Sequence, residues 1–393
     1  MSRRSLPPRA PSTRPATLAH DVDVLVVGAG IVGLAHAVEA SARGASVVVV
    51  ERDDRALGAS VRSLGHVAVT AQDGPALACA LVTRDKWIAL GRQAGFDVSE
   101  AGSVVVARAE DELAVLEDFV CARDGAAHLL DRAGVARHLR SVDDDVVGGA
   151  LLATDLRVDP RVAVPEIARW LSAQPRAAVV TGTSVLGVEP GSGRSLVRTS
   201  RGDVIARTVV LAVGADVDRL LPAVAEAHGL TRRTRQALRV TGPTAPGERG
   251  AGGGTVLLGG TAVLHHAGLT RSPQHKEVRE RLEREQPEVV AAEVNLRATP
   301  LADGSLLLGD AGAQGGALPF RAEALDELLL REGERLVGGP LRVVERWAAV
   351  EATAPEPFVV ARPQRGLLVV TVGAPIGLST AFGLAPRTLD GLL

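Results

Sequence analysis

The first apolar run along the chain predicts a buried strand that leads into a helix. Residues 22–27 (VDVLVV) end at a glycine cluster, as strands buried on both faces of a parallel sheet do. The alanine-rich segment that follows indicates a helix ending at Arg43-Gly44, and residues 46–51 (SVVVVE) indicate a second buried strand. These three segments predict a compact βαβ unit.

Helical and strand-like patterns alternate along the rest of the chain. Amphipathic helices are predicted at 76–94 and 110–122, with a strand at 102–108 between them. After residue 154 we expect a loop, a helix opened by Val164-Pro165, and short strands joined by tight turns. The remaining elements are a flexible loop at 241–254, a charged surface helix at 275–286, a strand at 305–310, a helix at 323–336, and a terminal strand, glycine-rich turn and helix after residue 365.

This order of elements predicts an α/β protein with two domains. We expect a Rossmann-like domain on a parallel sheet with βαβ connections, and an inserted α+β domain on an antiparallel sheet. Residues 1–20, rich in Pro, Ser and Arg, predict a disordered basic tail. The expected Rossmann-like domain comprises residues 21–75, 150–231 and 359–393, and the inserted domain comprises residues 76–149 and 232–358.

Composition narrows the chemistry expected of the chain. Hydrophobic residues make up 46% of the sequence and aromatic residues 2%, with no tyrosine, so the cores must be built from Val, Leu and Ala. The net charge of -2 argues against a nucleic-acid or membrane surface. No apolar run is long enough for a membrane span. Cys79 and Cys121 form neither a metal set nor a disulfide framework, which favours a reducing, cytoplasmic setting.

The sequence GAGIVG predicts a dinucleotide-binding loop. Gly28, Gly30 and Gly33 fit the pattern G-x-G-x-x-G directly after a strand and at the start of a helix. The first glycine permits a tight turn, the second lets a pyrophosphate approach the backbone, and the third lets helix and strand pack closely. Glu51 ends the next strand, where its carboxylate can accept the ribose hydroxyls. The motif leaves NAD and FAD open as cofactors.

Further segments extend this motif into a family resemblance. They are GAS at 58–60, TDLRVDP at 154–160, TVVLAVGA at 208–215 and TVGAPIGLSTAFGLA at 371–385. With the glycine loop and Glu51-Arg52, they make nearly the whole chain resemble the D-amino-acid oxidase superfamily of flavoproteins, which includes glycine and sarcosine oxidases. Within it, GASVRSLGH, AGSVVVAR and DGSLLLGD look most like the branch associated with the use of phosphonates.

The resemblance implies FAD as the cofactor. Binding is expected to be non-covalent, because no cysteine follows Cys121 to form a C-terminal link of the sarcosine-oxidase kind. The glycine loop is expected to hold the pyrophosphate, the carboxylate of Glu51 the adenosine ribose, and the terminal glycine turn the flavin. The expected FAD-binding residues are Gly28, Ala29, Gly30, Ile31, Val32, Gly33, Glu51, Arg52, Ala59, Ser60, Gly65, Val185, Ala212, Val213, Gly214, Gly373, Ala374, Gly377, Leu378, Ser379 and Thr380.

The resemblance also implies a reaction. A hydride passes from the carbon that bears an amine to flavin N5, the imine hydrolyses to a carbonyl, and oxygen or another acceptor reoxidises the flavin. The expected substrate is a small amine with an acidic group, preferably an aminophosphonate. The alternatives are an ordinary amino acid such as glycine, sarcosine or a D-amino acid, a 2-hydroxy acid, or a flavin protein without turnover. Pro375 in the terminal turn, and Glu351 in a segment where the family commonly has an aromatic residue, depart from the pattern.

An acidic substrate requires fixed cations, because an anion buried without partners is prohibitively costly. Arg62 and His66 are the expected substrate contacts, in a loop whose Gly65 lets the chain bend beneath the flavin. His265 or His266 is a further candidate, and only one of them can face the flavin if residues 260–269 form a strand. Other charged residues have simpler interpretations: Arg271 and Arg321 as surface arginines, Asp310 as a strand end, and residues 143–145 as a solvated loop.

Overall fold

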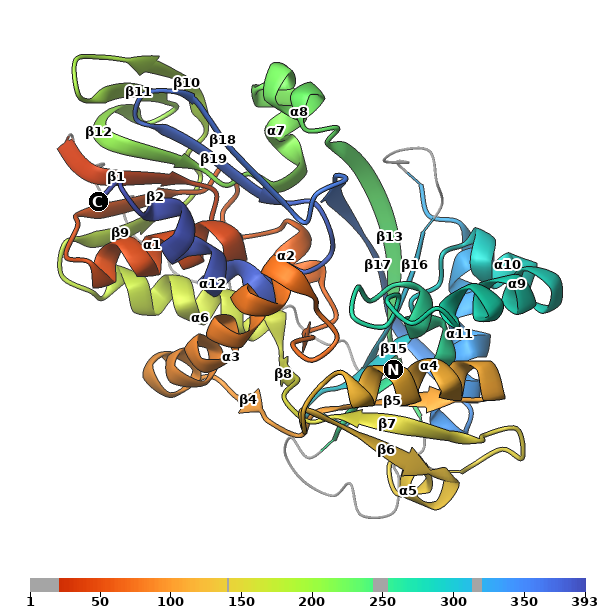
Figure 1. Cartoon of the computed structure of the whole chain (residues 1–393). Coiled ribbons are helices and arrows are strands. Elements are labelled where there is room, and N and C mark those ends of the chain that lie inside the picture. Colours follow the sequence, from red (N-terminus) through yellow and green to blue (C-terminus); the bar gives the residue numbers. More distant parts are fainter. Residues whose placement is uncertain (1–20, 140, 243–253, 313–319) are drawn as a thin grey trace, which may run out of the picture.

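The computed structural model describes residues 21–139, 141–242, 254–312 and 320–393 (Figure 1). The expected tail at 1–20 and nearly all of the expected loop at 241–254 lie outside the described residues. The described strands form two eight-stranded sheets and one three-stranded sheet. Figure 1 shows the two large sheets on opposite sides of the molecule, with helices packed around them.

The first sheet has a parallel centre made of valine-rich strands. Its order is β10-β11-β12-β1-β2-β9, and β19 joins it beside β12 and carries β18 at its edge. β1 pairs in parallel with both β2 and β12, so Val24 lies opposite Val47. β-branched residues such as valine are well suited to strands that are buried on both faces of a sheet. The strands are β1 (Asp21–Val27), β2 (Val47–Val50), β9 (Ala177–Val180), β10 (Val185–Pro190), β11 (Ser195–Thr199), β12 (Gly202–Leu211), β18 (Phe358–Gln364) and β19 (Leu367–Val372).

Helices from distant parts of the chain pack together on the first sheet. The C-terminal helix α12 contacts both α1 and α3. Trp87 of α3 is fully buried there and donates its indole N–H to the carbonyl oxygen of Leu378 over 2.7 Å. The helices on this face are α1 (Ile31–Ala42), α2 (Ala59–Arg62), α3 (Gly74–Ala94), α6 (Pro160–Ser172) and α12 (Gly377–Leu389). On the other face lie η1 (Gly214–Asp216), α7 (Val217–Leu220) and α8 (Pro222–Ala227).

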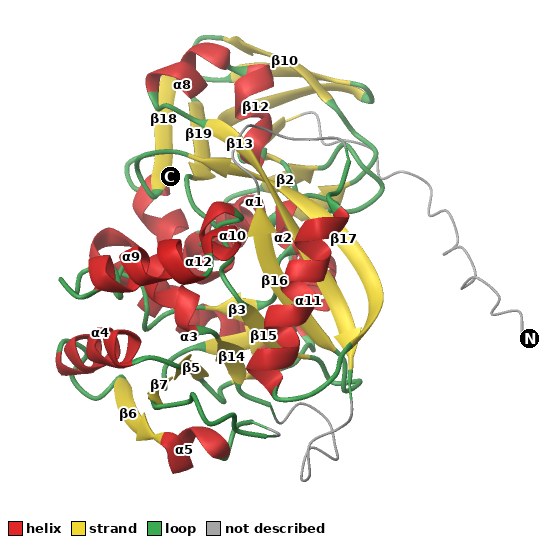
Figure 2. Ribbon diagram, turned by 90° about the vertical axis from the view of Figure 1, so that its right-hand side faces the viewer, coloured by secondary structure: helices red, strands yellow, loops and turns green. Residues whose placement is uncertain are grey.

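The second sheet is mostly antiparallel. Its order is β17-β13-β16-β15-β14-β5-β7-β6, and only the β14–β5 pair among these is parallel. Figure 2 shows helix α11 beside the long strands β13, β16 and β17. The strands are β5 (Ser103–Ala107), β6 (Ala127–Asp131), β7 (Gly148–Leu152), β13 (Thr231–Thr241), β14 (Val256–Leu258), β15 (Arg297–Pro300), β16 (Leu306–Gly312) and β17 (Arg342–Thr353). The helices are α4 (Glu110–Cys121), α5 (Arg132–Ala136), η2 (Gly260–Leu264), α9 (His275–Glu285), α10 (Pro287–Ala291) and α11 (Glu323–Val337).

A small three-stranded sheet is built from the segments in which the chain passes from one large sheet to the other. It consists of β3 (His66–Val67), β8 (Leu156–Val158) and β4 (Val98–Ser99), with β8 in the centre. The segment that carries His66 therefore pairs with residues 156–157, far along the chain. This pairing fixes His66 against a strand that the sequence pattern did not indicate.

The expected fold class is confirmed, and two local predictions are wrong. A parallel-centred sheet with βαβ connections and a separate antiparallel sheet are both present. Helix α6 begins at Pro160 and not at Val164-Pro165, because Asp159 caps it by accepting the N–H of Arg161. Residues 260–264 form a 3-10 helix instead of the expected strand. The expected domain boundaries stay a prediction, and helix α3, placed there with the inserted domain, packs on α12.

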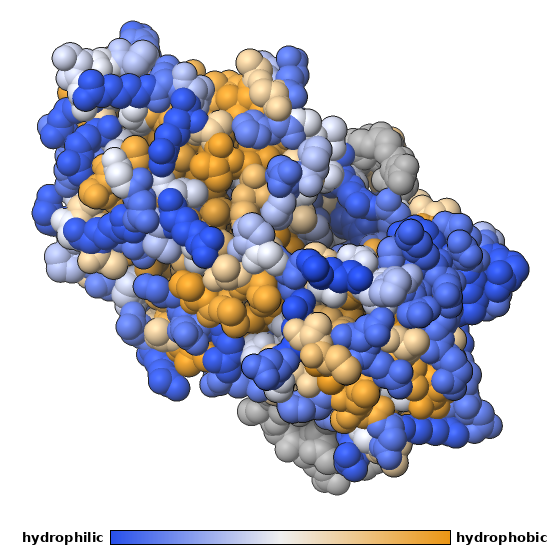
Figure 3. Space-filling model, in the orientation of Figure 1, coloured by the Kyte–Doolittle hydropathy of each residue, from blue (hydrophilic) through white to orange (hydrophobic). Residues whose placement is uncertain are grey.

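The outer surface carries mixed polarity. Figure 3 shows hydrophilic residues over most of one face, with hydrophobic residues gathered in patches between them. Within the described ranges, no helix combines the length and apolar character that crossing a membrane requires.

The buried histidine His36 should make stability depend on pH. Its ring lies between α1 and α12, bonded to the carbonyl oxygen of Val32 and the hydroxyl of Thr388, both at 2.7 Å. Burial lowers the pKa of His36 from 6.5 to about 4. Below pH 6.5 the unfolded chain therefore binds a proton that the folded chain does not, and stability falls as the pH falls. Between pH 6.5 and 4.5, the wild type should lose about 2–3 kcal/mol more of its unfolding free energy than His36→Gln does, measured by denaturant titrations. A difference independent of pH contradicts this assignment.

Candidate functional site

The main cavity of the described structure has a volume of about 840 Å³ and is lined by residues of both large sheets. One part of its wall is the loop after β1, from Gly28 to Val32, together with Glu51 at the end of β2. Another part is formed by β13, β15, β16 and β17 of the second sheet. This volume is in the range of sites for large cofactors and their substrates.

The glycine loop has the shape that a pyrophosphate requires. Gly28 has a φ of +102°, and a Cβ there would lie 2.5 Å from the carbonyl oxygen of Ala212. A Cβ at Gly33 would overlap the carbonyl oxygen of Gly28. Gly30 differs, because its nearest neighbour would be the Ser60 hydroxyl at 3.2 Å, on the cavity side. The first and third glycines thus close the turn, and the second keeps backbone accessible from the cavity.

Glu51 and its neighbours line the cavity next to this loop. The Glu51 carboxylate accepts the N–H of Ala29 over 2.9 Å and the N–H of Asp53 over 3.2 Å, which orients it beside the glycine loop. Arg52 forms an ion pair of 2.6 Å with Asp216 across the cavity wall. A dinucleotide with its pyrophosphate at the loop and its ribose at Glu51 fits this arrangement.

The cavity brings together most of the expected FAD-binding residues. Those that line it are Gly28, Gly30, Ile31, Val32, Glu51, Arg52, Ala59, Ser60, Val185, Ala212, Val213, Gly214, Ala374, Gly377 and Leu378. The others lie behind the wall: Ala29, Gly33, Gly65, Gly373, Ser379 and Thr380. Gly65, for example, has a φ of +73° and packs against β8, so it shapes the bend without forming part of the cavity surface.

Arg62 and His66 also line the cavity, in different environments. Arg62 is exposed and donates to the carbonyl oxygen of Ala348 over 3.1 Å. The His66 side chain is fully buried, and its Nε2 lies 2.9 Å from the carboxylate of Asp155. Burial acts to raise the pKa of Asp155, but the hydrogen bonds from His66 and Ser103 outweigh it and hold that pKa below its usual value. Nδ1 of His66 has no hydrogen-bond partner among the described residues.

A cluster of charged residues projects into the cavity from the second sheet. Arg235 of β13 donates Nε–H to Asp310 of β16 over 2.8 Å, and Arg297 of β15 donates to the other oxygen of the same carboxylate. Burial acts to raise the pKa of Asp310, but Arg235 and Arg297 outweigh it and lower that pKa. Arg235 also lies 3.5 Å from Glu293, which pairs with Arg233, so the cluster carries three cations and two anions, with a net charge of +1.

Glu351 of β17 lines the same part of the cavity. Burial and the nearby charge of Asp310 raise the pKa of its carboxyl to about 7, although Arg235, Arg297 and Arg233 oppose the rise. Its charge thus changes close to neutral pH.

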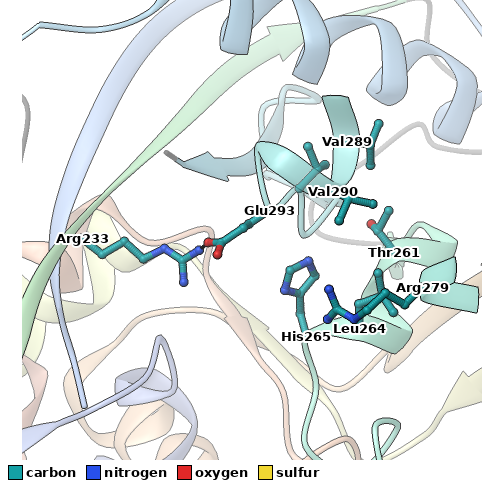
Figure 4. A pocket seen from close by; sticks show the side chains of 9 residues that line it. Arg233, Thr261, Leu264, His265, Arg279, Val289, Val290 and Glu293 are labelled. Carbon is teal, nitrogen blue, oxygen red and sulfur yellow. Dashed lines mark ion pairs between the residues drawn. The ribbon is translucent and has the colours of Figure 1, made fainter. Parts of the chain in front are cut away.

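His265 and His266, which directly follow the 3-10 helix η2, do not line the main cavity. His265 lines a smaller cavity of about 130 Å³, with Thr261, Arg279 and the Arg233–Glu293 ion pair around it (Figure 4). His266 is buried with its ring centroid 6.5 Å from that of His66. Neither residue lines the main cavity, so the structure gives no geometric support for a substrate contact from either.

Asp310 lies near the end of strand β16, as expected, but it has a role there that the sequence did not indicate. It lies within β16 and is the shared partner of two cavity arginines. Arg271 is a surface arginine paired with Asp73, as expected, whereas Arg321 is partly buried and pairs with the buried carboxylate of Asp326; both lie outside the cavity. The residues that sequence reasoning missed are Arg235 and Arg297. The signal for Arg235 was its spacing of two from Arg233 in TRRTRQALR, which places two arginines on one face of a strand. Arg297 carried no comparable signal.

Comparison with known proteins identifies a family and a set of relatives. The family model DAO, described as FAD dependent oxidoreductase, matches residues 23–388. The tRNA 5-methylaminomethyl-2-thiouridine biosynthesis bifunctional protein MnmC of Burkholderia pseudomallei (strain 1710b) is 30% identical over 409 residues. The match covers 95% of this chain and 57% of that protein, so the chain spans little more than half the length of this relative.

Solved structures share the fold over almost the whole chain. Glycine oxidase from Geobacillus kaustophilus has a TM-score of 0.76 at 19% identity, with 95% of each chain covered. L-alpha-glycerophosphate oxidase from Mycoplasma pneumoniae, with FAD bound, has a TM-score of 0.73 at 18% identity, covering 95% of this chain and 94% of that one.

Proposed function

Because the chain belongs to the DAO family of FAD-dependent oxidoreductases, we propose that it oxidises a carbon–nitrogen bond of a small amine that carries an acidic group. FAD, when bound, supplies the acceptor for the hydride that leaves the substrate carbon. The cavity supports this proposal, because it joins a dinucleotide-binding loop to a charged wall in one space. The observation that carries it is the pair of arginines, Arg235 and Arg297, on that wall.

The charge balance of this wall bears on the substrate class. Arg235 and Arg297 share Asp310, so the cluster has a net charge of +1. A group with one negative charge, such as a carboxylate, would be neutralised by this cluster alone, whereas a doubly charged phosphonate would need Arg62 as well, which is exposed and already donates to the carbonyl oxygen of Ala348. We therefore propose an amino acid or related amine carboxylate as the substrate, with an aminophosphonate as the competing candidate.

The names of similar proteins suggest which compounds to test. One structural neighbour is a glycine oxidase, and the relatives of known sequence are named for the biosynthesis of a methylaminomethyl-thiouridine in tRNA. Both names refer to compounds with an aliphatic amine. The net charge of -2 offers little attraction for tRNA by itself, so we propose a small molecule as the substrate.

The test is anaerobic mixing of the FAD-loaded protein with a panel of compounds, followed at the flavin absorption band. The panel contains glycine, sarcosine, D-alanine, 2-aminoethylphosphonate, glycolate and bulk tRNA. Bleaching by an amino acid is the expected result. Bleaching by 2-aminoethylphosphonate alone favours the competing candidate, and bleaching by glycolate alone contradicts the assignment to a carbon–nitrogen bond. Chemically reducible FAD that no compound bleaches would indicate a flavin protein without turnover.

Arg62 should contribute to substrate binding and not to FAD binding. It is exposed at the cavity wall and can reach an acidic group there. We expect Arg62→Gln to raise KM for the reducing amine by about tenfold, with kcat and FAD content near wild type. Arg198→Gln is the matched control, because Arg198 is 57% exposed and pairs with Glu189 outside the cavity. Loss of FAD from Arg62→Gln would place this arginine at the cofactor instead.

A further inference from the structure

Glu351 differs from the other carboxylates that line the main cavity. Glu51 accepts two backbone N–H groups, and Asp53 and Asp216 form ion pairs with Arg52. Asp310 is held by two arginines. Among the described residues, Glu351 is the cavity carboxylate for which no hydrogen bond or ion pair is found. Glu351 is half-buried at the cavity wall, and a carboxylate held there without a partner is costly, which points to a partner that arrives with the ligand.

The position of Glu351 in the sheet puts it beside the anion-binding arginines. β13 and β17 are antiparallel, with Arg233 opposite Glu351 and Arg235 opposite Ala349. Directly opposite residues share a face of the sheet, as do residues two apart in a strand. Arg235 and Glu351 therefore lie diagonally across one face, as neighbours within reach of a single small ligand. One end of such a ligand can meet a cation while the other meets a carboxylate.

We propose that Glu351 receives the ammonium group of the substrate and takes its proton, which makes the amine ready for oxidation. The inference rests on the proposed function. The step transfers one proton: the N–H bond of the ammonium breaks, an O–H bond forms on Glu351, and the amine keeps the electron pair. The free amine then loses hydride from its α-carbon to the flavin, and the nitrogen electron pair forms the C=N bond. Substrates of this site are therefore zwitterions, with an acid at Arg235 and Arg297 and an amine at Glu351.

Charged groups on every neighbouring element act on Glu351. They are Arg233 and Arg235 on β13, Asp310 on β16, Arg297 on β15, Arg62 on α2 and Asp216 on η1. Burial and the charge of Asp310 raise the pKa of Glu351 to about 7, although Arg235, Arg297 and Arg233 oppose the rise. The group is thus deprotonated, and able to accept a proton, only above neutral pH. The rate of reduction should rise with pH and level off above the pKa of Glu351.

The test compares Glu351→Gln with wild type in anaerobic stopped-flow reduction by the amine found in the panel. Wild type is expected to show a rate that rises about tenfold per pH unit below pH 7 and then levels off. Glu351→Gln should lose this inflection and respond only near the pKa of the free amine, about 8–10. Glu345→Gln is the matched control, because Glu345 lies on the same strand outside the cavity, paired with Arg161 and Arg239.

A second measurement does not depend on turnover. Glycine betaine and 3,3-dimethylbutanoate have the same shape, but only glycine betaine carries a positive charge. Neither compound has an amine nitrogen with a free electron pair, so neither can undergo the proposed oxidation. Wild type at pH 8 should bind glycine betaine at least about tenfold more tightly, measured by flavin difference spectra, and Glu351→Gln should bind both alike.

The outcomes separate this inference from the proposed function. An unchanged pH profile in Glu351→Gln, or equal affinity of wild type for the two isosteres, overturns the role of Glu351 while amine oxidation stands. A protein that no amine reduces overturns both. FAD content near wild type in Glu351→Gln is required throughout, since loss of FAD would place Glu351 at the cofactor and also overturn the inference.

Discussion

Replacing Gly33 by alanine should give a protein that no longer retains FAD. Gly33 lies in the first turn of α1, and a Cβ there would overlap the carbonyl oxygen of Gly28. The turn must then open, which moves the backbone N–H groups that we propose as the pyrophosphate site. We expect at least about a 100-fold loss of affinity for FAD, measured by the flavin content of purified protein and by titration of the apoprotein.

Two other glycines make this result interpretable. Gly187 lies in β10, and a Cβ there would have nothing within 4 Å, so Gly187→Ala should keep FAD and stability. Gly30→Ala should fold normally, because its nearest neighbour is the Ser60 hydroxyl at 3.2 Å, but should bind FAD more weakly since the methyl group projects toward the cavity. Full flavin content in Gly33→Ala would refute the assignment of this loop to the pyrophosphate. Failure of Gly33→Ala to fold leaves Gly30→Ala as the deciding variant.

The cofactor half of the site could be predicted from the sequence because its signals are local. Gly28, Gly30 and Glu51 are fixed by one βαβ unit of some thirty residues, and the strand–loop–helix order alone places them together. The valine-rich strands of the first sheet gave equally clear patterns. The start of α6 was missed because the capping bond from Asp159 outweighs the presence of Pro165 inside the helix.

The substrate half could not be predicted because its signals are not local. Arg235, Arg297 and Asp310 come from three different strands, and their meeting depends on the register of β13, β15 and β16. In a chain with 44 basic residues, single arginines carry little information. The expected strand at 260–269 is not formed, because residues 260–264 form a 3-10 helix; His265, which follows it, lines the small cavity, and His266 is buried. The spacing of two between Arg233 and Arg235 in β13 was a usable signal for Arg235 alone.

Exchanging Arg235 for methionine should weaken both substrate binding and stability. The Arg235 side chain is 8% exposed and shares Asp310 with Arg297. Its loss lowers the net charge of the cluster from +1 to zero and leaves Asp310 with one partner. We expect KM for the acidic amine to rise about 10- to 100-fold, and the free energy of unfolding to fall by about 3 kcal/mol. Steady-state kinetics and denaturant titrations give these two quantities. Arg198→Met, at an exposed ion pair, should change neither.

The double variant Arg235→Met/Asp310→Asn separates charge from geometry. It restores the net charge of +1, now carried by Arg297 alone, and removes the carboxylate that Arg235 neutralised. If the site selects its substrate by charge balance, the double variant should recover at least about tenfold in KM over Arg235→Met, together with part of the lost stability. A double variant as poor as the single one would mean that Arg235 acts through its fixed geometry toward the acid group. A wild-type KM in Arg235→Met would mean that the acid group binds elsewhere on the cavity wall.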